Sequence, residues 1–234
     1  MPTPAALSAT AALLGDPARA AMLQALFGGE ALTASELARI AGIAPPTASA
    51  HLAKLADGGL VSVHAQGRHR YHRLANEEVA TLLELMGGLT AAVQPTRKWP
   101  HGDALRTARF CYDHLAGRLG VALHEGLTRR AWLEPEAGGW RATEAGAQGM
   151  AALGIDLPAA QASRRFACDC MDWSERRPHL RGGLGRELAQ CCLRRGWVRR
   201  SGGDRGDALA HRRVALTPEG ARALHAALGV DLAA

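Results

Sequence analysis

The stretch that most constrains the fold is residues 44–74, which reads APPTASAHLAKLADGGLVSVHAQGRHRYHRL. Ala44-Pro45-Pro46 is typical of a helix start, because the first N–H groups of a helix have no partner inside it. Gly58-Gly59 is typical of a helix end, where a left-handed residue is favoured. A strand, a turn at residues 66–68 and a return strand over residues 69–74 follow. The stretch therefore predicts a helix followed by a basic β-hairpin.

The predicted helix has two different sides. Leu52 and Leu55 supply an apolar side, and polar residues at helical spacing lie on or near the other side, namely Thr47, Ser49, His51 and Lys54. Three arginines follow within six residues of the hairpin turn: Arg68, Arg70 and Arg73. Exposed arginines there are suited to phosphate oxygens or to the DNA minor groove. Solvated basic hairpins are also common, so the charge alone does not decide between the two interpretations.

The segment before residues 44–74 favours the DNA-binding interpretation over the solvated hairpin. Residues 5–14 read as a first helix, and Asp16-Pro17 is an N-cap that starts a second helix ending near Phe27. Thr33 and Glu36 have the spacing of a capping box, which starts a short helix ending at Gly42. Short helices in this order, followed by helix 45–57 and the hairpin, predict a winged helix-turn-helix.

Residues 6–86 resemble the ArsR family of bacterial winged-helix repressors. The resemblance lies in three stretches: LGDPARAAMLQAL, LTASELARIAGIAPPTASAHLAKLADGGLV and QGRHRYHRL. It implies a cytoplasmic homodimer that binds double-stranded DNA at an inverted repeat, as a repressor released by a small inducer. It also implies that the helix at residues 76–93 pairs with the first helix across the dimer, and that no membrane is involved.

The resemblance also implies which residues contact DNA: Thr47, Ser49, Ala50, His51 and Lys54 in the recognition helix, and Arg68 and Arg70 in the wing. Ala50 departs from the family, in which many members carry Arg at that position. One family metal site uses two cysteines where this chain has Thr33 and Ser35. Another uses histidine and acidic ligands on the last helix, and residues 76–93 contain no histidine. We therefore expect neither familiar metal site here.

The length of 234 residues allows two modest domains. No apolar run of about 18 residues predicts a transmembrane helix, and the N-terminus has no basic segment before its apolar part, so it does not read as an export signal. Two prolines and a glycine at residues 94–102 predict a linker. The expected division is a DNA-binding and dimerisation domain at residues 1–93, the linker at 94–102 and a sensor domain at 103–234. The net charge of +6 permits an anionic partner.

Residues 114–157 and 179–232 resemble each other, which predicts a duplicated unit. His114 matches His179 at an offset of 65, and Cys111 matches Cys170 at an offset of 59. Each copy is expected to run helix, strand, turn, strand, helix, with each histidine at the start of its first helix. The fold class expected for the whole chain is α+β: mainly helical with small β-hairpin wings, a winged helix-turn-helix followed by two repeated helix–hairpin–helix units.

The five cysteines lie in the second half of the chain, and without an export signal we expect reduced thiols. If the copies pack about a pseudo-two-fold axis, Cys111 and Cys170 face each other. With Cys168, His114 and His179 they would then form a sensor for a soft metal or arsenite, or a regulatory disulfide. The alternative is that the cysteines are core residues, which is the better explanation for Cys192 and leaves Cys191 without a sharp role.

Two further alternatives stay open for the second half. A small organic ligand is one, in a cavity lined by Trp132, Trp173 and Trp197. A purely structural domain that adds dimer contacts is the other. An enzyme with a cysteine nucleophile is not expected, because the sequence has no nucleophile elbow, phosphate loop or metal-protease helix.

Overall fold

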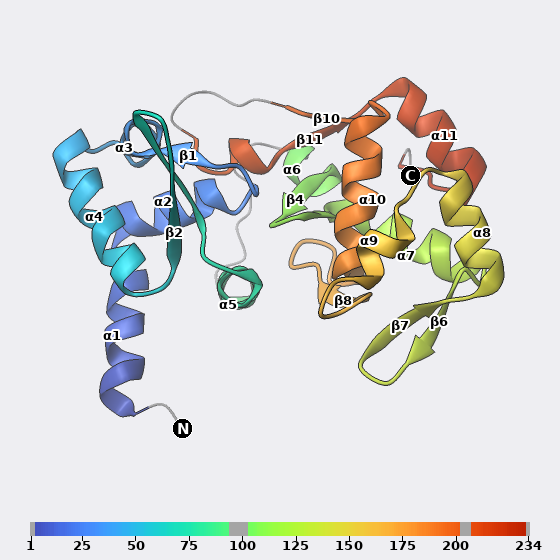
Figure 1. The fold of residues 1–234 in the computed structure, drawn as a ribbon, viewed down its shortest axis with the longest axis horizontal. Helices are drawn as coiled ribbons and strands as arrows, with labels where there is room; N and C mark the ends of the chain where they lie inside the picture. Colours follow the sequence, from blue (N-terminus) through green and yellow to red (C-terminus); the bar gives the residue numbers. More distant parts are fainter. Residues whose placement is uncertain (1–2, 94–102, 202–206, 233–234) are drawn as a thin grey trace. The chain divides into compact units, whose positions relative to one another are not determined.

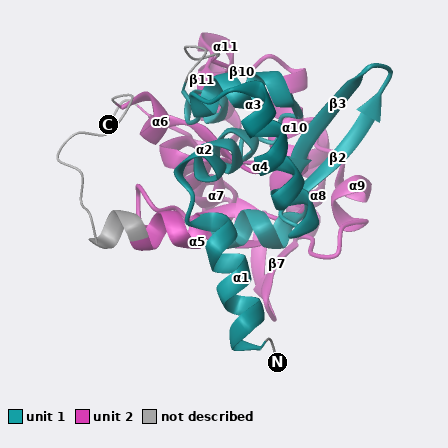
Figure 2. Ribbon diagram, turned by 90° about the vertical axis from the view of Figure 1, so that its left-hand side faces the viewer, with its two compact units in different colours: residues 1–83, 202–212 teal, residues 84–201, 213–234 magenta. Residues whose placement is uncertain are grey.

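The computed structural model describes residues 3–93, 103–201 and 207–232. The chain forms two compact units (Figure 2): unit 1 contains residues 1–83 and 202–212, and unit 2 contains residues 84–201 and 213–234. The linker expected at residues 94–102 lies outside the described residues. Among the described residues, no helix is both long and apolar enough to cross a membrane.

Unit 1 follows the order expected for a winged helix-turn-helix (Figure 1). Its elements are α1 (Pro4–Leu14), α2 (Pro17–Leu26), β1 (Leu32–Thr33), α3 (Ala34–Ala41), α4 (Pro45–Asp57), β2 (Val61–Gln66) and β3 (His69–Leu74). The final helix, α5 (Glu77–Val93), begins in unit 1 and ends in unit 2. The strands form an antiparallel sheet in the order β1-β3-β2, and α4 packs against β2.

Local signals in the sequence explain where these elements begin and end. The capping box expected at the start of α3 is confirmed: Glu36 N–H donates to the Thr33 hydroxyl, and a Glu36 carboxylate oxygen accepts from the Thr33 N–H at 2.8 Å. Gly42 ends α3 at a φ of 65°, a left-handed conformation that glycine adopts without a Cβ penalty. The buried side of α4 carries Ala48, Leu52 and Leu55.

Unit 1 also includes residues 207–212, although the strands on either side belong to unit 2. A 3₁₀ turn, η1 (Ala210–Arg212), lies against α2. The Arg212 guanidinium carbon lies 4.2 Å from the centre of the Phe27 ring, and its Nη1 donates to Gln24 Oε1 at 3.4 Å. The backbone approaches so closely at Gly28 that a Cβ there would lie 2.5 Å from the His211 carbonyl oxygen.

Unit 2 contains two successive stretches with the same order of elements. After α6 (Ala104–Thr107), the first stretch consists of β4 (Arg109–Cys111), β5 (His114–Ala116), α7 (Gly117–Arg129), β6 (Leu133–Glu136), β7 (Gly139–Ala142) and α8 (Glu144–Ala152). After α9 (Leu157–Gln161), the second consists of β8 (Cys168–Met171), β9 (Pro178–Arg181), α10 (Gly183–Arg194), β10 (Val198–Arg200), β11 (Val214–Leu216) and α11 (Pro218–Leu228). Each pair of consecutive strands forms an antiparallel two-stranded sheet.

The two stretches share one core. It is built from apolar side chains of both, including Phe110, Leu119, Leu123, Leu127, Leu184, Leu188 and Leu224. The central helices are exchanged in their packing: α7 of the first stretch packs against β9 of the second, and α10 packs against β5. Gly120 in α7 and Gly185 in α10 allow this, because a Cβ there would lie 3.3 Å from the His179 Cβ and 3.2 Å from the His114 Cβ, respectively.

Candidate functional site

The recognition helix expected from the sequence is α4, and its exposed side is polar. Thr47, Ser49, Ala50 and Lys54 are exposed, and His51 is half-buried. The wing residues Arg68 and Arg70 are also exposed, beside the turn that joins β2 to β3. The arrangement presents hydroxyl, imidazole and cationic groups from a helix and from the adjacent hairpin, as groove recognition of DNA requires.

Two of these helix residues have defined partners. The Ser49 hydroxyl donates to the Pro45 carbonyl at 3.0 Å. His51 Nδ1 lies 3.2 Å from Nη1 of Arg19 in α2, and Arg19 also donates to the Leu13 carbonyl at 2.8 Å. Because a guanidinium only donates, His51 Nδ1 accepts this bond, and the ring proton of the neutral imidazole is on Nε2. Arg19 therefore positions His51, a role that the sequence analysis did not identify.

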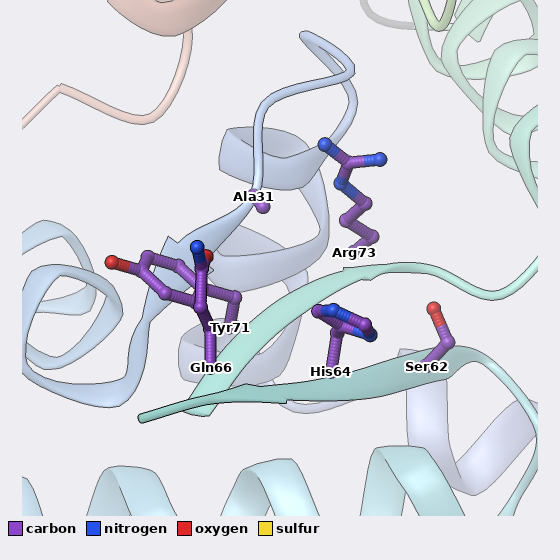
Figure 3. A pocket seen from close by; sticks show the side chains of 6 residues that line it. All are labelled: Ala31, Ser62, His64, Gln66, Tyr71 and Arg73. Carbon is purple, nitrogen blue, oxygen red and sulfur yellow. The ribbon is translucent and has the colours of Figure 1, made fainter. Parts of the chain in front are cut away.

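One face of the wing is hollowed (Figure 3). The hollow has a volume of about 510 Å³. It is lined by Ala31 before β1 and by the alternating side chains of the hairpin: Ser62, His64, Gln66, Tyr71 and Arg73. His64 and Tyr71 are direct cross-strand partners, as are Ser62 and Arg73. The hollow is therefore a polar face of the wing sheet.

The position of the family's cysteine metal site serves a structural role here. The Thr33 hydroxyl donates to Glu36 Oε2 at 2.7 Å and accepts the helix-capping bond. Ser35 is exposed in the first turn of α3. Hydroxyl oxygens are poor ligands for soft metals, so the expectation that unit 1 lacks this metal site stays a prediction.

Unit 2 brings four of the expected sensor residues together: Cys111, His114, Cys170 and His179. The β4–β5 hairpin pairs Cys111 with His114, and the β8–β9 hairpin pairs Cys170 with His179. Cross-strand partners present their side chains on the same face of a sheet, so each hairpin supplies one thiol and one imidazole. The histidines thus lie in strands before α7 and α10, whereas the sequence analysis placed them at the start of those helices.

The four ligand atoms converge. One sulfur or nitrogen atom from each residue lies within 4.8 Å of the other three. The Sγ atoms of Cys111 and Cys170 are 4.0 Å apart, and the Nε2 atoms of His114 and His179 are 3.2 Å apart. Cys111, His114 and His179 are buried, and Cys170 is half-buried.

Carboxylates lie behind both imidazoles. His114 Nδ1 is 3.0 Å from Asp113 Oδ1, and His179 Nδ1 is 3.3 Å from Asp172 Oδ2. Asp172 is fully buried and accepts hydrogen bonds from Arg109 at 2.8 Å and from the Gly117 N–H at 2.7 Å. Burial opposes ionisation of Asp172, but His179 and Arg109 outweigh it and hold the pKa of this carboxyl well below its ordinary value.

The electrostatics favour a thiolate beside a charged imidazole. The hydrogen bond from Cys111, together with His114 and His179, lowers the pKa of the Cys170 thiol far below its ordinary value, although burial opposes this. Burial disfavours the charged form of His114, yet Asp113 and Cys170 raise its pKa above the ordinary value. A low-pKa thiol is both a better metal ligand and a more reactive group toward oxidants.

The other cysteines and the tryptophans have different surroundings. Cys168 is buried on β8 and is not part of the four-residue group. Cys191 and Cys192 are buried members of the core, and burial raises the pKa of Cys192 to about 12. Trp132 and Trp197 pack with the core, while Trp173 stacks on the guanidinium of Arg109 at 4.4 Å. The sequence analysis did not identify Arg109, which contacts both Asp172 and Trp173.

Unit 1, with its capped short helices, exposed polar helix and basic hairpin, defines a winged helix-turn-helix DNA-binding protein. Residues 14–64 match a family model described as a helix-turn-helix domain. The HTH-type transcriptional regulator YdfF of Bacillus subtilis (strain 168) is 39% identical over 189 residues, which cover 80% of this chain and 84% of YdfF.

Solved structures are similar to about two fifths of the chain. The ArsR family transcriptional regulator RHA00566 is 31% identical, covers 42% of this chain and 98% of its own, and has a TM-score of 0.32. The homodimeric winged helix-turn-helix domain of Mb0332 from Mycobacterium bovis, a possible ArsR-family regulator, is 26% identical over 41% of this chain and 89% of its own, with a TM-score of 0.36. The chain belongs to the HTH-type transcriptional regulators, and its relationship to the ArsR family stays a prediction from the sequence.

Proposed function

We propose that the protein is a homodimeric repressor that binds an inverted-repeat operator and is released by a thiophilic inducer at the Cys111, His114, Cys170 and His179 cluster. Residues 1–93 would bind DNA and dimerise, and residues 103–234 would sense the inducer. The observation that carries the sensing role is the convergence of two thiols and two imidazoles in a buried group of unit 2. The inducer class is a soft metal, arsenite or an oxidant of thiols.

The DNA-binding part of the proposal rests on the exposed side of α4 and on the wing. Thr47, Ser49, Ala50, His51 and Lys54 would face base edges and phosphates in the major groove, and Arg68 and Arg70 would grip the backbone or the minor groove. A two-fold dimer would place its half-sites about one helical turn, 34–36 Å, apart.

Exposed apolar side chains support the dimer. Leu7 on α1 is 66% exposed. On α5, Leu85 and Leu89 are 66% and 67% exposed, and Leu82 and Met86 are exposed as well. Apolar side chains repeated along one helix and left in solvent are typical of an interface. The resemblance assigns α1 and α5 to that interface.

A gel shift on the DNA upstream of the protein's own gene tests the whole proposal. The reduced protein should bind, and one or more of a panel of thiophilic ions, arsenite and a mild oxidant should release it. The double variant Cys111→Ser/Cys170→Ser should still bind and should resist release. Cys168→Ser is the matched control, because this buried thiol lies outside the cluster, and it should respond as the wild type does.

Two outcomes would contradict the proposal at different points. Failure of the protein to bind any fragment of its upstream region would contradict the operator. Release of the double variant by the same agent, or by a small organic compound alone, would show that the inducer is sensed outside the cluster.

A further inference from the structure

We propose that Cys111, His114, Cys170 and His179 bind one divalent ion of the zinc class in a closed tetrahedral site that joins the two halves of unit 2. This inference names the ion for the sensor cluster, so its regulatory effect rests on the proposed function. The binding itself stands on the geometry of the four side chains.

The spacing of the ligand atoms fits a tetrahedron. With Zn–S distances of about 2.3 Å and Zn–N distances of about 2.0–2.1 Å, the edges of a tetrahedral site are about 3.8 Å between two sulfurs and about 3.3 Å between two nitrogens. The structure has 4.0 Å between the Sγ atoms of Cys111 and Cys170. It has 3.2 Å between the Nε2 atoms of His114 and His179. Both separations are therefore close to those that the ion requires.

The imidazole rings are oriented for metal binding. In each ring Nδ1 faces a carboxylate, Asp113 behind His114 and Asp172 behind His179. A carboxylate at Nδ1 places the ring proton there and leaves the Nε2 lone pair for the metal, as in the carboxylate–histidine–zinc arrangement. The two Nε2 atoms are the ones that converge. Asp172 is itself fixed by Arg109 and the Gly117 N–H, so its support of His179 is rigid.

A cation satisfies this cluster better than protons do. Two Nε2 atoms 3.2 Å apart share only one proton between them, since a proton on each would leave two donors facing each other. The Sγ atoms of Cys111 and Cys170, 4.0 Å apart, are restricted in the same way, because only one of the two thiols can donate its proton to the other. An ion at the centre accepts a lone pair from all four atoms at once, and it also compensates the charge of two thiolates in a largely buried site.

The donor set selects the class of ion. Two sulfurs and two nitrogens at tetrahedral spacing favour Zn²⁺. Ca²⁺ and Mg²⁺ are excluded, because both prefer oxygen ligands. Arsenite is trivalent and binds up to three thiolates, but Cys168 is not part of the group, so only two are present. A disulfide would need the two sulfur atoms to approach from 4.0 Å to about 2.05 Å.

The site would connect the two stretches of unit 2. The β4–β5 hairpin supplies Cys111 and His114, and the β8–β9 hairpin supplies Cys170 and His179. Four protein ligands leave no open position, which is the pattern of structural rather than catalytic zinc. Ion binding would therefore link the two hairpins. Because α7 and α10 pack on these hairpins, it would also stabilise unit 2 as a whole.

Cobalt titration of the reduced, full-length protein tests the inference. After chelation and removal of the chelator, Co²⁺ alone should bind one per chain and give the visible bands of tetrahedral cobalt, with a thiolate charge-transfer band in the near ultraviolet. Zn²⁺ should displace it and bleach both. Cys111→Ser and His179→Gln should abolish the tetrahedral spectrum, and Cys168→Ser should leave it unchanged.

A second variant protects the test against simple misfolding. Cys170→His keeps four ligands while removing one thiolate, so the tetrahedral bands should persist with a weaker charge-transfer band. A protein that merely lost its fold would lose both. Absence of a tetrahedral spectrum in the wild type, or an unchanged spectrum in Cys111→Ser, would overturn the inference.

The same samples separate this inference from the proposed function. If Co²⁺ and Zn²⁺ bind as described but no ion, arsenite or oxidant of the panel changes the gel shift, the ion site stands and the sensing role fails. If an oxidant releases the protein from DNA and neither ion binds, the sensing role stands and the zinc-class site fails.

Discussion

Arg70 and the two polar residues of α4 should affect DNA binding in different ways. Arg70 is exposed on the wing, so Arg70→Ala should weaken binding to all sequences and reduce the salt dependence of log K by about one. Ser49→Ala or His51→Ala should instead relax the sequence preference, at a cost of about 1–3 kcal/mol for the preferred site. Titrated gel shifts at several salt concentrations with matched and scrambled DNA measure both effects.

A surface arginine of unit 2 provides the control for charge alone. Arg141 is exposed on β7 and pairs with Glu134 at 2.6 Å. Arg141→Ala changes the net charge by the same amount as Arg70→Ala and should leave the salt slope unaltered. Equal losses in the two variants would mean that total charge, rather than the wing, determines affinity.

His72 should make the stability of unit 1 depend on pH. It is buried on β3 with Nδ1 3.3 Å from the Leu32 carbonyl oxygen. Burial, with a smaller effect of Arg70, lowers its pKa below the ordinary value. The fold therefore favours the neutral ring. The stabilisation is complete above the unfolded-state pKa of about 6.5 and is lost as the pH falls from there toward the lowered pKa.

Hydrogen exchange of the β3 amides measures this effect by comparing wild type with His72→Gln at each pH, so that the intrinsic pH dependence of exchange cancels. The difference in opening free energy between the two proteins should be constant above about pH 6.5. Below that pH the wild type should lose opening free energy relative to His72→Gln. A difference that stays constant down to about pH 5 would show that His72 is not the titrating group.

At the level of single residues, the sequence predicted which residues form the candidate site better than it predicted the residues that they contact. Cys111 and Cys170, and His114 and His179, were paired from two different offsets along the chain. Arg109 gave no such signal, since its ion pair with Asp172 joins residues 63 apart. The bond between Arg19 and His51 spans 32 residues and was missed for the same reason. Contacts between elements depend on tertiary packing, which one sequence does not display.

The exchange of helices between the two stretches of unit 2 makes a prediction at the level of elements. A Cβ on Gly120 would lie 2.3 Å from the Leu115 carbonyl oxygen, and one on Gly185 would lie 2.5 Å from that of Leu180. Gly120→Ala and Gly185→Ala should each destabilise unit 2 by about 1–3 kcal/mol, the usual range for overpacking. Both should also weaken Co²⁺ binding, because each glycine lies beside a histidine of the other stretch.

Tryptophan fluorescence during urea unfolding measures this loss, because the tryptophans among the described residues, Trp132, Trp140, Trp173 and Trp197, all belong to unit 2. Gly87→Ala is the control, since a Cβ there has open space around it. If Gly120→Ala lowered the stability of unit 2 and Gly185→Ala did not, the prediction would be wrong for the packing of α10 against the first stretch.

Elements were predictable where local chemistry sets them. The capping box at Thr33, the prolines that begin α4 and the turn after β2 gave the winged helix almost completely. The hairpins β4–β5 and β8–β9 were missed as strand pairs. Strands of three or four residues are too short for an alternating pattern, and the tight turn at Tyr112 uses a φ of 62°, which is uncommon for a residue other than glycine.

At the level of the whole molecule, the chain does not divide at one point. Residues 207–212 belong to unit 1, while β10 and β11 on either side of that connection belong to unit 2. The sequence shows residues 201–210 only as a polar, glycine-rich segment. It does not indicate that Arg212 stacks on Phe27.

The whole molecule should become more stable when the ion binds. A ligand that binds only the folded state stabilises it by about 2.7 kcal/mol at a free concentration of 100 times its Kd. Zn²⁺ at that excess should raise the melting temperature of unit 2, followed by tryptophan fluorescence, in wild type and in Cys168→Ser. It should leave Cys111→Ser unchanged, because that variant lacks one of the four ligands. Asp113→Asn should shift the ion concentration needed upward by about 10–100-fold, the range for losing a carboxylate behind a ligand histidine. An equal rise in Cys111→Ser would place the stabilising ion elsewhere on the chain.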